Sequence, residues 1–200
     1  MCSLFQSKPI FLDLPNAEII YFQNFLSEEK ANWIFEELKK NTPWQQDEIT
    51  VYGKKHLQPR LTALYGNDEK SYSYSNIKMH PHHWTSLLQE IRTLVEDLTK
   101  TNFTTVLINY YRDGNDSNGW HADNEKELGT NPTIASLSLG AERNFQLKHN
   151  SNSSIKKNII LENGSLLVMK GTTQHFWKHQ IPKTTKIIGP RINLTFRVIK

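Results

Sequence analysis

The chain has 200 residues, of which 37% are hydrophobic and 22% are charged. This length and balance fit one globular domain with a sizeable core, and they exclude an intrinsically disordered chain. The net charge of +4 and the pI of about 9.0 tilt toward an anionic partner, although many basic proteins bind no nucleic acid.

The single cysteine, Cys2, excludes an intramolecular disulfide framework and a cysteine-based zinc site, and it fits a reducing compartment. Residues 1–15 lack the apolar centre of a signal peptide. No apolar run approaches the ~18 residues that a membrane-spanning helix needs. We therefore expect a soluble protein that works inside the cell, in the cytoplasm or, in a eukaryote, in the nucleus.

Two amphipathic helices are expected in the first half of the chain. Ser27 is a suitable N-cap for the first helix. The apolar residues of that helix recur at the spacing of one helical face: Ala31, Ile34, Phe35 and Leu38. The second helix is expected to begin near Pro81. Its apolar stripe is longer: Trp84, Leu87, Leu88, Ile91, Leu94, Val95 and Leu98.

From residue 103 onward the hydrophobic pattern changes to the period of two that is typical of strands. Strands are expected at residues 103–111, 134–139, 143–149, 159–161, 165–170, 175–181 and 192–199. The polar segment 149–158 should be a loop between strands. Helices followed by many short antiparallel strands indicate an α+β fold, here a double-stranded β-helix (jelly roll) buttressed by N-terminal helices. The strand pattern alone does not distinguish a jelly roll from another sandwich.

One face of the last strand carries only polar residues: Arg191, Asn193, Thr195 and Arg197. At ~3.3 Å per residue, Arg191 and Arg197 lie about 20 Å apart at Cα, and each side chain reaches roughly 6 Å inward. The remaining gap suits a short dicarboxylate, because a guanidinium group matches a carboxylate. Asn109 and Tyr111 share another strand face and could hydrogen-bond a keto acid. Taken alone, each pattern is more typical of an ordinary strand face.

His121 and Asp123 are two residues apart, so in an extended segment their side chains point the same way. They would supply two ligands of a 2-His-1-carboxylate facial triad. The third ligand would be His175 or His179, which are four residues apart and could share one side of a strand. A lone H-x-D motif is common by chance, so the argument depends on the order in which all these motifs occur.

In that order, the motifs resemble the AlkB family of Fe(II)- and 2-oxoglutarate-dependent dioxygenases. The resemblance is carried by NYYRDG, GWHADNEKEL, PTIASLSLG, GSLLVMKG and PRINLTFR, of which the last is the most specific. VYGKKHLQPRLTALYG, residues 51–66, resembles the subgroup that acts on duplex DNA. The resemblance begins near residue 45. It places an N-terminal extension with the first helix at 1–44 and a catalytic region with a nucleotide-recognition lid at 45–200, within one monomeric domain.

The resemblance implies a role for each matching residue. Iron(II) would be held by His121, Asp123 and His179; His179 is preferred to His175 because it precedes the QIP turn, twelve residues before Arg191. The co-substrate 2-oxoglutarate, used together with O₂, would be bound by Asn109, Tyr111, Arg191, Asn193 and Arg197. Substrate contacts would come from Tyr52, Arg60, Tyr65, Tyr74 and Glu125.

These substrate contacts differ in kind. The resemblance implies that Glu125 faces the alkylated base, that Tyr52 wedges into the base stack, and that Tyr65 and Tyr74 belong to the lid. The basic cluster would contact phosphate and make binding salt-sensitive; it comprises Lys54, Lys55, His56 and Arg60. A solvated hairpin tip is the simpler explanation of that cluster.

The activity implied by the resemblance is oxidative demethylation of N-alkylated DNA bases, with release of formaldehyde, succinate and CO₂. Lesions such as 1-methyladenine and 3-methylcytosine carry positive charge, which Glu125 could stabilise, and they cannot pair normally, so extruding them costs less. Asn124 stands where duplex-acting relatives often carry Asp, and Tyr52 where Phe is usual, so the form of the substrate stays open. The alternatives are RNA as the substrate, another oxygenase of this fold, or a jelly-roll binding module without catalysis.

Overall fold

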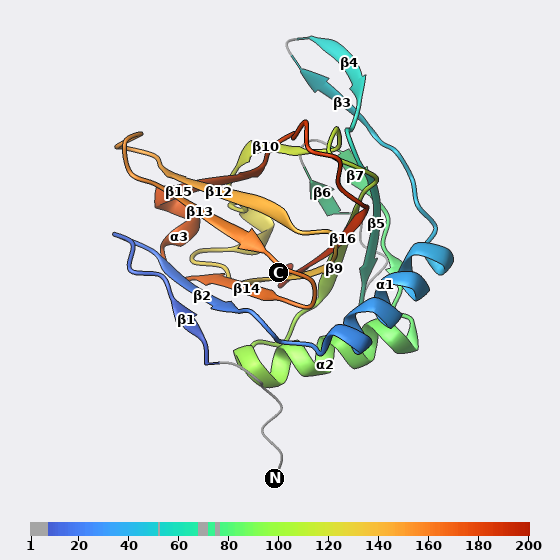
Figure 1. The fold of residues 1–200 in the computed structure, drawn as a ribbon. Helices are drawn as coiled ribbons and strands as arrows, with labels where there is room; N and C mark the ends of the chain where they lie inside the picture. The colour runs from blue at the N-terminus through green and yellow to red at the C-terminus, as the bar shows by residue number, and fades with distance from the viewer. Residues whose placement is uncertain (1–7, 52, 68–71, 75–76) are drawn as a thin grey trace.

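Two sheets lie face to face in the computed structural model, which describes residues 8–51, 53–67, 72–74 and 77–200 (Figure 1). The larger sheet has eight strands in the order β1-β2-β14-β11-β16-β9-β5-β8, and the smaller has four in the order β10-β15-β12-β13. Neighbouring strands are antiparallel except β5 and β8. With helices on one side, this arrangement confirms the expected α+β fold of the double-stranded β-helix type.

The larger sheet consists of β1 (Ile10–Phe11), β2 (Glu18–Phe22), β5 (Leu61–Gly66), β8 (His82–His83), β9 (Thr105–Tyr111), β11 (Ile134–Gly140), β14 (Leu166–Lys170) and β16 (Arg191–Arg197). The smaller consists of β10 (Asn118–His121), β12 (Arg143–His149), β13 (Lys156–Leu161) and β15 (Trp177–Ile181). Two hairpins pair β3 (Glu48–Val51) with β4 (Lys54–Leu57) and β6 (Tyr72–Tyr74) with β7 (Ile77–Met79). The helices are α1 (Glu28–Asn41), α2 (Ser86–Thr99), α3 (Thr173–Phe176) and the 3₁₀ turn η1 (Lys126–Leu128).

Helices α1 and α2 cover the outer face of the larger sheet (Figure 1). The first helix is confirmed as expected: the Ser27 hydroxyl accepts a hydrogen bond from the Lys30 N–H at 3.3 Å, and the helix buries its apolar face against the sheet. The expected start of the second helix near Pro81 is wrong. Thr85 caps α2 instead, by accepting from the Leu88 N–H at 3.2 Å, and the preceding residues pair with β5 as strand β8.

One hydrophobic core lies between the helices and the larger sheet, and a second core fills the space between the two sheets. Strand β16 separates the two cores, because its alternate residues point to opposite faces. Ile192, Leu194 and Phe196 pack toward the helices, while the polar residues that alternate with them line a pocket between the sheets. The predicted split of this strand into one apolar and one polar face is therefore confirmed. The polar face is buried rather than solvated.

All seven strands expected after residue 103 overlap observed strands, but some boundaries move. The expected strand 175–181 is partly wrong, because Thr173–Phe176 forms α3 and β15 begins at Trp177. Strand β13 begins at Lys156, so the predicted loop 149–158 is shorter than expected. The strands before residue 103 and the short strand β10 were not expected from the pattern.

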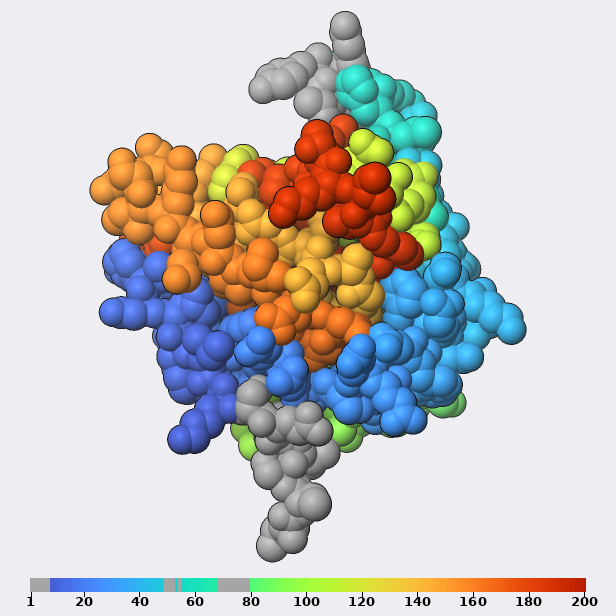
Figure 2. Space-filling view, in the orientation of Figure 1, coloured from blue at the N-terminus to red at the C-terminus, as the bar shows by residue number. Residues whose placement is uncertain are grey.

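Part of the predicted N-terminal extension belongs to the larger sheet, because β2 pairs with β14. The hairpin β3–β4 stands out from the body of the molecule at the top of Figure 1, and the coloured atoms of β4 lie at the same edge in Figure 2. Within the described part of the chain, no helix combines the length and apolar character needed to cross a membrane.

Candidate metal centre and its pocket

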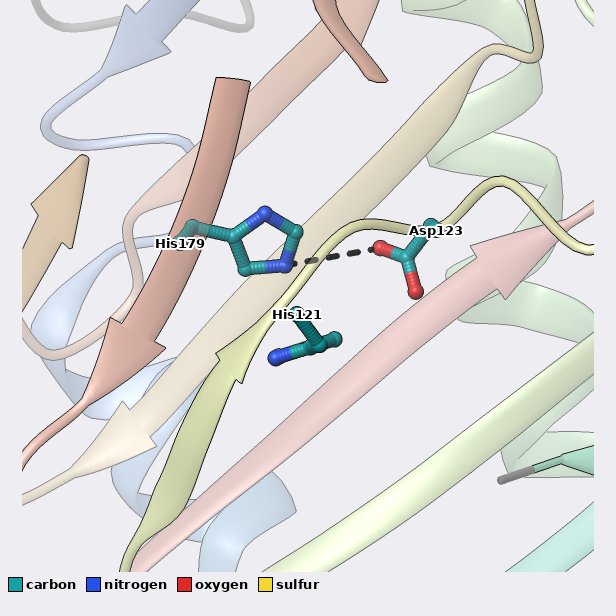
Figure 3. Close-up of side chains that lie close together, drawn as sticks. All are labelled: His121, Asp123 and His179. Carbon is teal, nitrogen blue, oxygen red and sulfur yellow. Dashed lines mark ion pairs between the residues drawn. The ribbon is translucent and has the colours of Figure 1, made fainter. Parts of the chain in front are cut away.

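Three potential metal ligands meet in the pocket between the sheets. His121 ends β10, His179 lies in β15, and Asp123 lies in the loop that follows β10 (Figure 3). Strands β10 and β15 are paired with His121 directly opposite His179, after an irregularity in the register. One ligand atom from each of the three residues lies within 4.8 Å of the others. Two imidazoles and a carboxylate are the donor set of a facial triad.

Neighbouring groups fix the orientation of the two rings. The ring centroids of His121 and His179 are 4.2 Å apart, and Phe145 stacks on His179 at 5.1 Å. His121 Nδ1 lies 2.7 Å from the Gly119 carbonyl oxygen, so Nδ1 carries the proton and donates it. This contact leaves the lone pair on His121 Nε2. A metal-binding histidine usually donates the proton of its other ring nitrogen in this way.

The electrostatics of the cluster favour the protonation states that a cation requires. Burial would raise the pKa of Asp123, but Arg197 and the two histidines outweigh it and lower that pKa to about 2. Burial and the neighbouring His121 lower the pKa of His179 to about 3, and burial also lowers the pKa of His121. At neutral pH the contact of 3.6 Å between His179 Nε2 and Asp123 Oδ2 therefore joins a neutral ring to a carboxylate. A metal ion could therefore bind to these three side chains without displacing a proton from any of them.

The polar face of β16 continues this pocket across neighbouring strands. Asn193 lies opposite Asn109 of β9 and Ser138 of β11, and Arg191 lies opposite Tyr111. Directly opposed residues project from the same face of a sheet, so these side chains converge on one wall. The pairing places Asn109 and Tyr111 beside the last strand, and their expected role in binding 2-oxoglutarate stays a prediction.

Arg191 is the buried cation at the end of this wall. It is 1% exposed, and burial lowers its pKa to about 10, so it stays charged at neutral pH. Its Nη2 donates to the Ser138 hydroxyl at 2.9 Å, and its guanidinium lies 5.2 Å from the centre of the Tyr111 ring. Its Nε and Nη1 find no hydrogen-bond partner among the described residues. A buried guanidinium with two free donors fits a carboxylate ligand.

Arg197, at the other end of the strand, contacts the metal cluster directly. Its Nη2 donates to Asp123 Oδ1 at 2.5 Å, and both side chains are buried. Arg197 therefore orients a potential iron ligand. Its expected contact with a carboxylate of 2-oxoglutarate stays a prediction.

The expected substrate residues are placed less uniformly. Glu125 follows the triad loop, burial raises the pKa of its carboxyl group, and its Oε2 is buried without a partner in the described part of the chain. The prediction of Tyr65 as a lid residue is wrong, because Tyr65 is 4% exposed and belongs to the core beneath the helices. Tyr52 lies outside the described residues. Tyr74 ends β6, and its side chain, like Tyr52, lies outside the described part of the structure.

The prediction of Arg60 as an exposed phosphate contact is also wrong. Arg60 is 5% exposed, and its Nε donates to Asn109 Oδ1 at 2.8 Å. Its Nη1 donates to the Ser117 carbonyl at 3.2 Å. A buried guanidinium must pair with polar groups, and here it supports the pocket wall from behind. Lys55 and His56, by contrast, are exposed on β4.

His175, the other histidine considered as a ligand, points elsewhere. It is exposed on α3, and its Nε2 lies 2.9 Å from Asn131 Oδ1. The group of potential metal ligands found in the described residues contains His179 and lacks His175. The geometry therefore favours His179, as expected.

Several pocket residues were missed in the sequence. Ser136 and Ser138 alternate on β11 opposite Thr195 and Asn193, and the alternation of IASLSL was the signal that could have revealed them. Asn118 Nδ2 lies 3.3 Å from His121 Nε2, but no motif marked it. Gln174 contacts the triad loop from a segment 51 residues away, and no local pattern could have shown this.

Comparison with known proteins points to the same family as the sequence motifs. The family model described as the 2OG-Fe(II) oxygenase superfamily matches residues 18–197. The chain is 39% identical over 192 residues to Alpha-ketoglutarate-dependent dioxygenase alkB homolog 3 of Mus musculus, covering 92% of this chain and 66% of that protein. It is 37% identical to DNA oxidative demethylase ALKBH2 of Homo sapiens, covering 85% of this chain and 69% of that protein.

The chain thus spans slightly less than two thirds of the mouse relative. Among solved structures, OsALKBH1 superposes with a TM-score of 0.69 over 96% of this chain and all of that chain, at 17% identity, which shows the fold. The sequence identities above 30% to the two relatives define the family of this chain more narrowly than the shared fold does. It belongs to the 2OG-Fe(II) oxygenase superfamily and, within it, to the AlkB family.

Proposed function

We propose that this chain demethylates N-alkylated bases of DNA oxidatively, using iron(II), 2-oxoglutarate and O₂. The observation that carries the proposal is that His121, Asp123 and His179 share one pocket with the partly unsatisfied guanidinium of Arg191. One relative is named as a DNA oxidative demethylase and another as an alpha-ketoglutarate-dependent dioxygenase, which supports the substrate class and the co-substrate.

Different residues of the pocket would bind iron(II) and 2-oxoglutarate. The triad would hold iron(II), and Arg191 would bind one carboxylate of 2-oxoglutarate with Ser138 and Tyr111 beside it. Iron(II) held there would allow O₂ to couple the oxidation of 2-oxoglutarate to succinate and CO₂ with the hydroxylation of an N-methyl group to N-hydroxymethyl. The C–N bond then breaks and the hydroxymethyl carbon leaves as formaldehyde. The hydroxyl proton passes to solvent and the ring nitrogen keeps the electron pair of the C–N bond, so that a cationic lesion becomes the neutral base.

Other residues would orient the reactants and exclude water. Arg197 holds the carboxylate of Asp123, and Phe145 shields one face of His179 from water. Glu125 lies two residues after Asp123, and the free oxygen of its side chain would face a positively charged lesion. We propose 1-methyladenine and 3-methylcytosine as substrates for this reason. A base that cannot pair normally also costs less to extrude.

The test is formaldehyde release from methylated duplex DNA, methylated single-stranded DNA and methylated RNA, each with iron(II) and 2-oxoglutarate. We expect turnover on DNA that requires both additions. Turnover confined to RNA would replace DNA with RNA as the substrate. If 2-oxoglutarate is consumed but no nucleic acid reacts, the chain is a different oxygenase of this fold. If neither is consumed, the binding-module alternative holds.

A further inference from the structure

Asp123 differs from the two histidines of the triad because it does not lie in a strand. His121 and His179 lie in paired strands, and their backbones are held by the ladder between β10 and β15. Asp123 lies between β10 and η1, outside any strand or helix, although it is 1% exposed. The position of its carboxylate therefore depends on the contacts of this one residue rather than on a ladder.

Gln174 supplies the contact that holds the Asp123 backbone. Its Oε1 accepts a hydrogen bond from the Asp123 N–H at 2.9 Å, and its Nε2 lies 3.6 Å from the sulfur of Met169. A backbone N–H can only donate, so the amide oxygen must face Asp123 and the amide nitrogen must face Met169. Gln174 is 1% exposed, so water does not compete for either end of the amide.

The turn that carries Gln174 is itself anchored. Thr173 donates from Oγ1 to the Lys170 carbonyl at 2.6 Å and accepts from the Glu18 N–H at 2.9 Å. These bonds tie α3 to β14 and β2. The same turn leads directly into β15, which carries His179. One short segment therefore sets the position of His179 through the chain and that of Asp123 through the Gln174 amide.

We propose that Gln174 is a positioning residue of the metal centre, which fixes the Asp123 loop so that its carboxylate faces both histidines. This inference rests on the proposed function of the same site. Partners that orient metal ligands from behind contribute about 10–100-fold to metal affinity. Removing the acceptor of Gln174 should therefore weaken metal binding by a factor in that range, while the contact between Arg197 and Asp123 remains.

The test is Mn(II) affinity of the full chain, measured by electron paramagnetic resonance, for three variants. Gln174→Met keeps the length of the side chain and removes the acceptor, and we expect the Mn(II) dissociation constant to rise about 10–100-fold. Gln174→Glu keeps an acceptor oxygen at the same place, and it should recover most of the affinity. His175→Ala changes the next residue of α3, which is exposed and contacts Asn131, and it should bind Mn(II) as the unchanged chain does.

A purely structural role would give a different result. If Gln174→Met lowers the melting temperature but binds Mn(II) with unchanged affinity, the inference is overturned. If that variant does not fold, Gln174→Asn, which shortens the side chain but stays polar, must show the loss of affinity, and normal affinity there overturns the inference. The absorption spectrum of bound Co(II) should also change in Gln174→Met and not in His175→Ala.

The same measurements separate this inference from the proposed function. If the unchanged chain binds no Mn(II), both ideas fail together. If it binds Mn(II) and Gln174→Met does not, but no nucleic acid is demethylated, the positioning role stands and the proposed function fails.

Discussion

Asp123 is the residue on which the contacts of the metal centre converge. Arg197 holds one carboxylate oxygen, His179 faces the other, and Gln174 holds the backbone. Arg197 is 3% exposed, so removing the Asp123 carboxylate breaks a buried ion pair. Breaking a buried pair in this way costs about 3–5 kcal/mol. Loss of activity in an Asp123 variant would therefore combine loss of the ligand with loss of stability.

His121→Ala separates these two effects. His121 is less buried than Asp123, and its hydrogen-bond contacts are with the Gly119 backbone carbonyl and the Asn118 amide. We expect iron-dependent turnover of 2-oxoglutarate to fall to background in His121→Ala, while its melting temperature stays within a few degrees of that of the unchanged chain. Asp123→Ala should also lose turnover, but its melting temperature should fall by about 10 °C.

Turnover assays and thermal unfolding of both variants check this expectation. Full activity of His121→Ala would show that the metal assignment is wrong. Equal melting temperatures for the two variants would show that the contact between Arg197 and Asp123 contributes little to stability.

Single residues were predictable where side-chain direction follows from spacing alone. His121 and Asp123 share a side because they are two residues apart, and Arg191 and Arg197 share a strand face for the same reason. Tyr65 was placed wrongly because spacing does not say which face of β5 packs under the helices. Asn124, between Asp123 and Glu125, is exposed beside the site.

At the scale of elements, the segment after β9 leads from the wall of the pocket to the triad. Arg112 donates to Asp116 through its backbone N–H and through two guanidinium nitrogens, at 2.8–2.9 Å. Arg143 donates to the backbone carbonyls of Asp113, Asp116 and Pro182. Residues 112–116, which lead from β9 toward β10, are therefore held by charged hydrogen bonds, and the strand ladder with β15 begins only at Asn118. Such contacts leave no periodic pattern, and β10 itself is only four residues long, which is why it was not expected from the sequence.

Asp116→Asn tests this anchor through its pH dependence. Burial raises the pKa of Asp116, but the hydrogen bonds from Arg112 outweigh burial and hold that pKa below its ordinary value. A carboxylate with a lowered pKa stabilises the fold above its unfolded pKa of about 3.9, and the contribution disappears as the pH falls through the lower folded value. We expect Asp116→Asn to reduce the free energy of unfolding by about 1.5–3 kcal/mol at pH 7.

Urea unfolding of both proteins at pH 7 and in the acid range measures this difference. The gap between them should narrow as the pH falls below about 4, because Asp116 of the unchanged chain is then protonated in the unfolded state and increasingly in the folded state. A gap that stays constant with pH would mean that the carboxylate charge contributes nothing to the anchor.

At the scale of the whole molecule, the sequence predicted the class of fold but not the complete sheets. Strands after residue 103 alternate clearly, because each buries one face in the core or the pocket. Strand β2 completes the larger sheet by pairing with β14, which lies more than 140 residues later in the chain. Pairing over such distances depends on the assembled core, so the local pattern of the N-terminal segment could not reveal it.

The projecting hairpin is connected to the metal centre through its base. The Pro59 carbonyl accepts from the Ser117 N–H at 2.8 Å, and the buried Arg60 bridges Ser117 to Asn109 of the pocket wall. Ser117 directly precedes β10, which carries His121. A nucleic acid bound to the hairpin would therefore lie near the segment that leads to the iron ligands. The exposed cation Lys55 lies on the hairpin itself.

We predict that Lys55→Ala weakens binding of methylated DNA without changing kcat. Lys55 pairs with Glu48 at 3.2 Å, but both side chains are more than half exposed, and exposed ion pairs contribute little, so the lysine is free to contact phosphate. Losing one phosphate contact should reduce the slope of log affinity against log salt by about 0.7–0.9.

Fluorescence anisotropy with a labelled oligonucleotide at several salt concentrations measures that slope. Lys40→Ala, an exposed lysine in the last turn of α1, is the matched control and should leave the slope unchanged. Identical slopes for Lys55→Ala and the unchanged chain would mean that the hairpin tip is a solvated turn, and that the DNA backbone binds elsewhere on the protein.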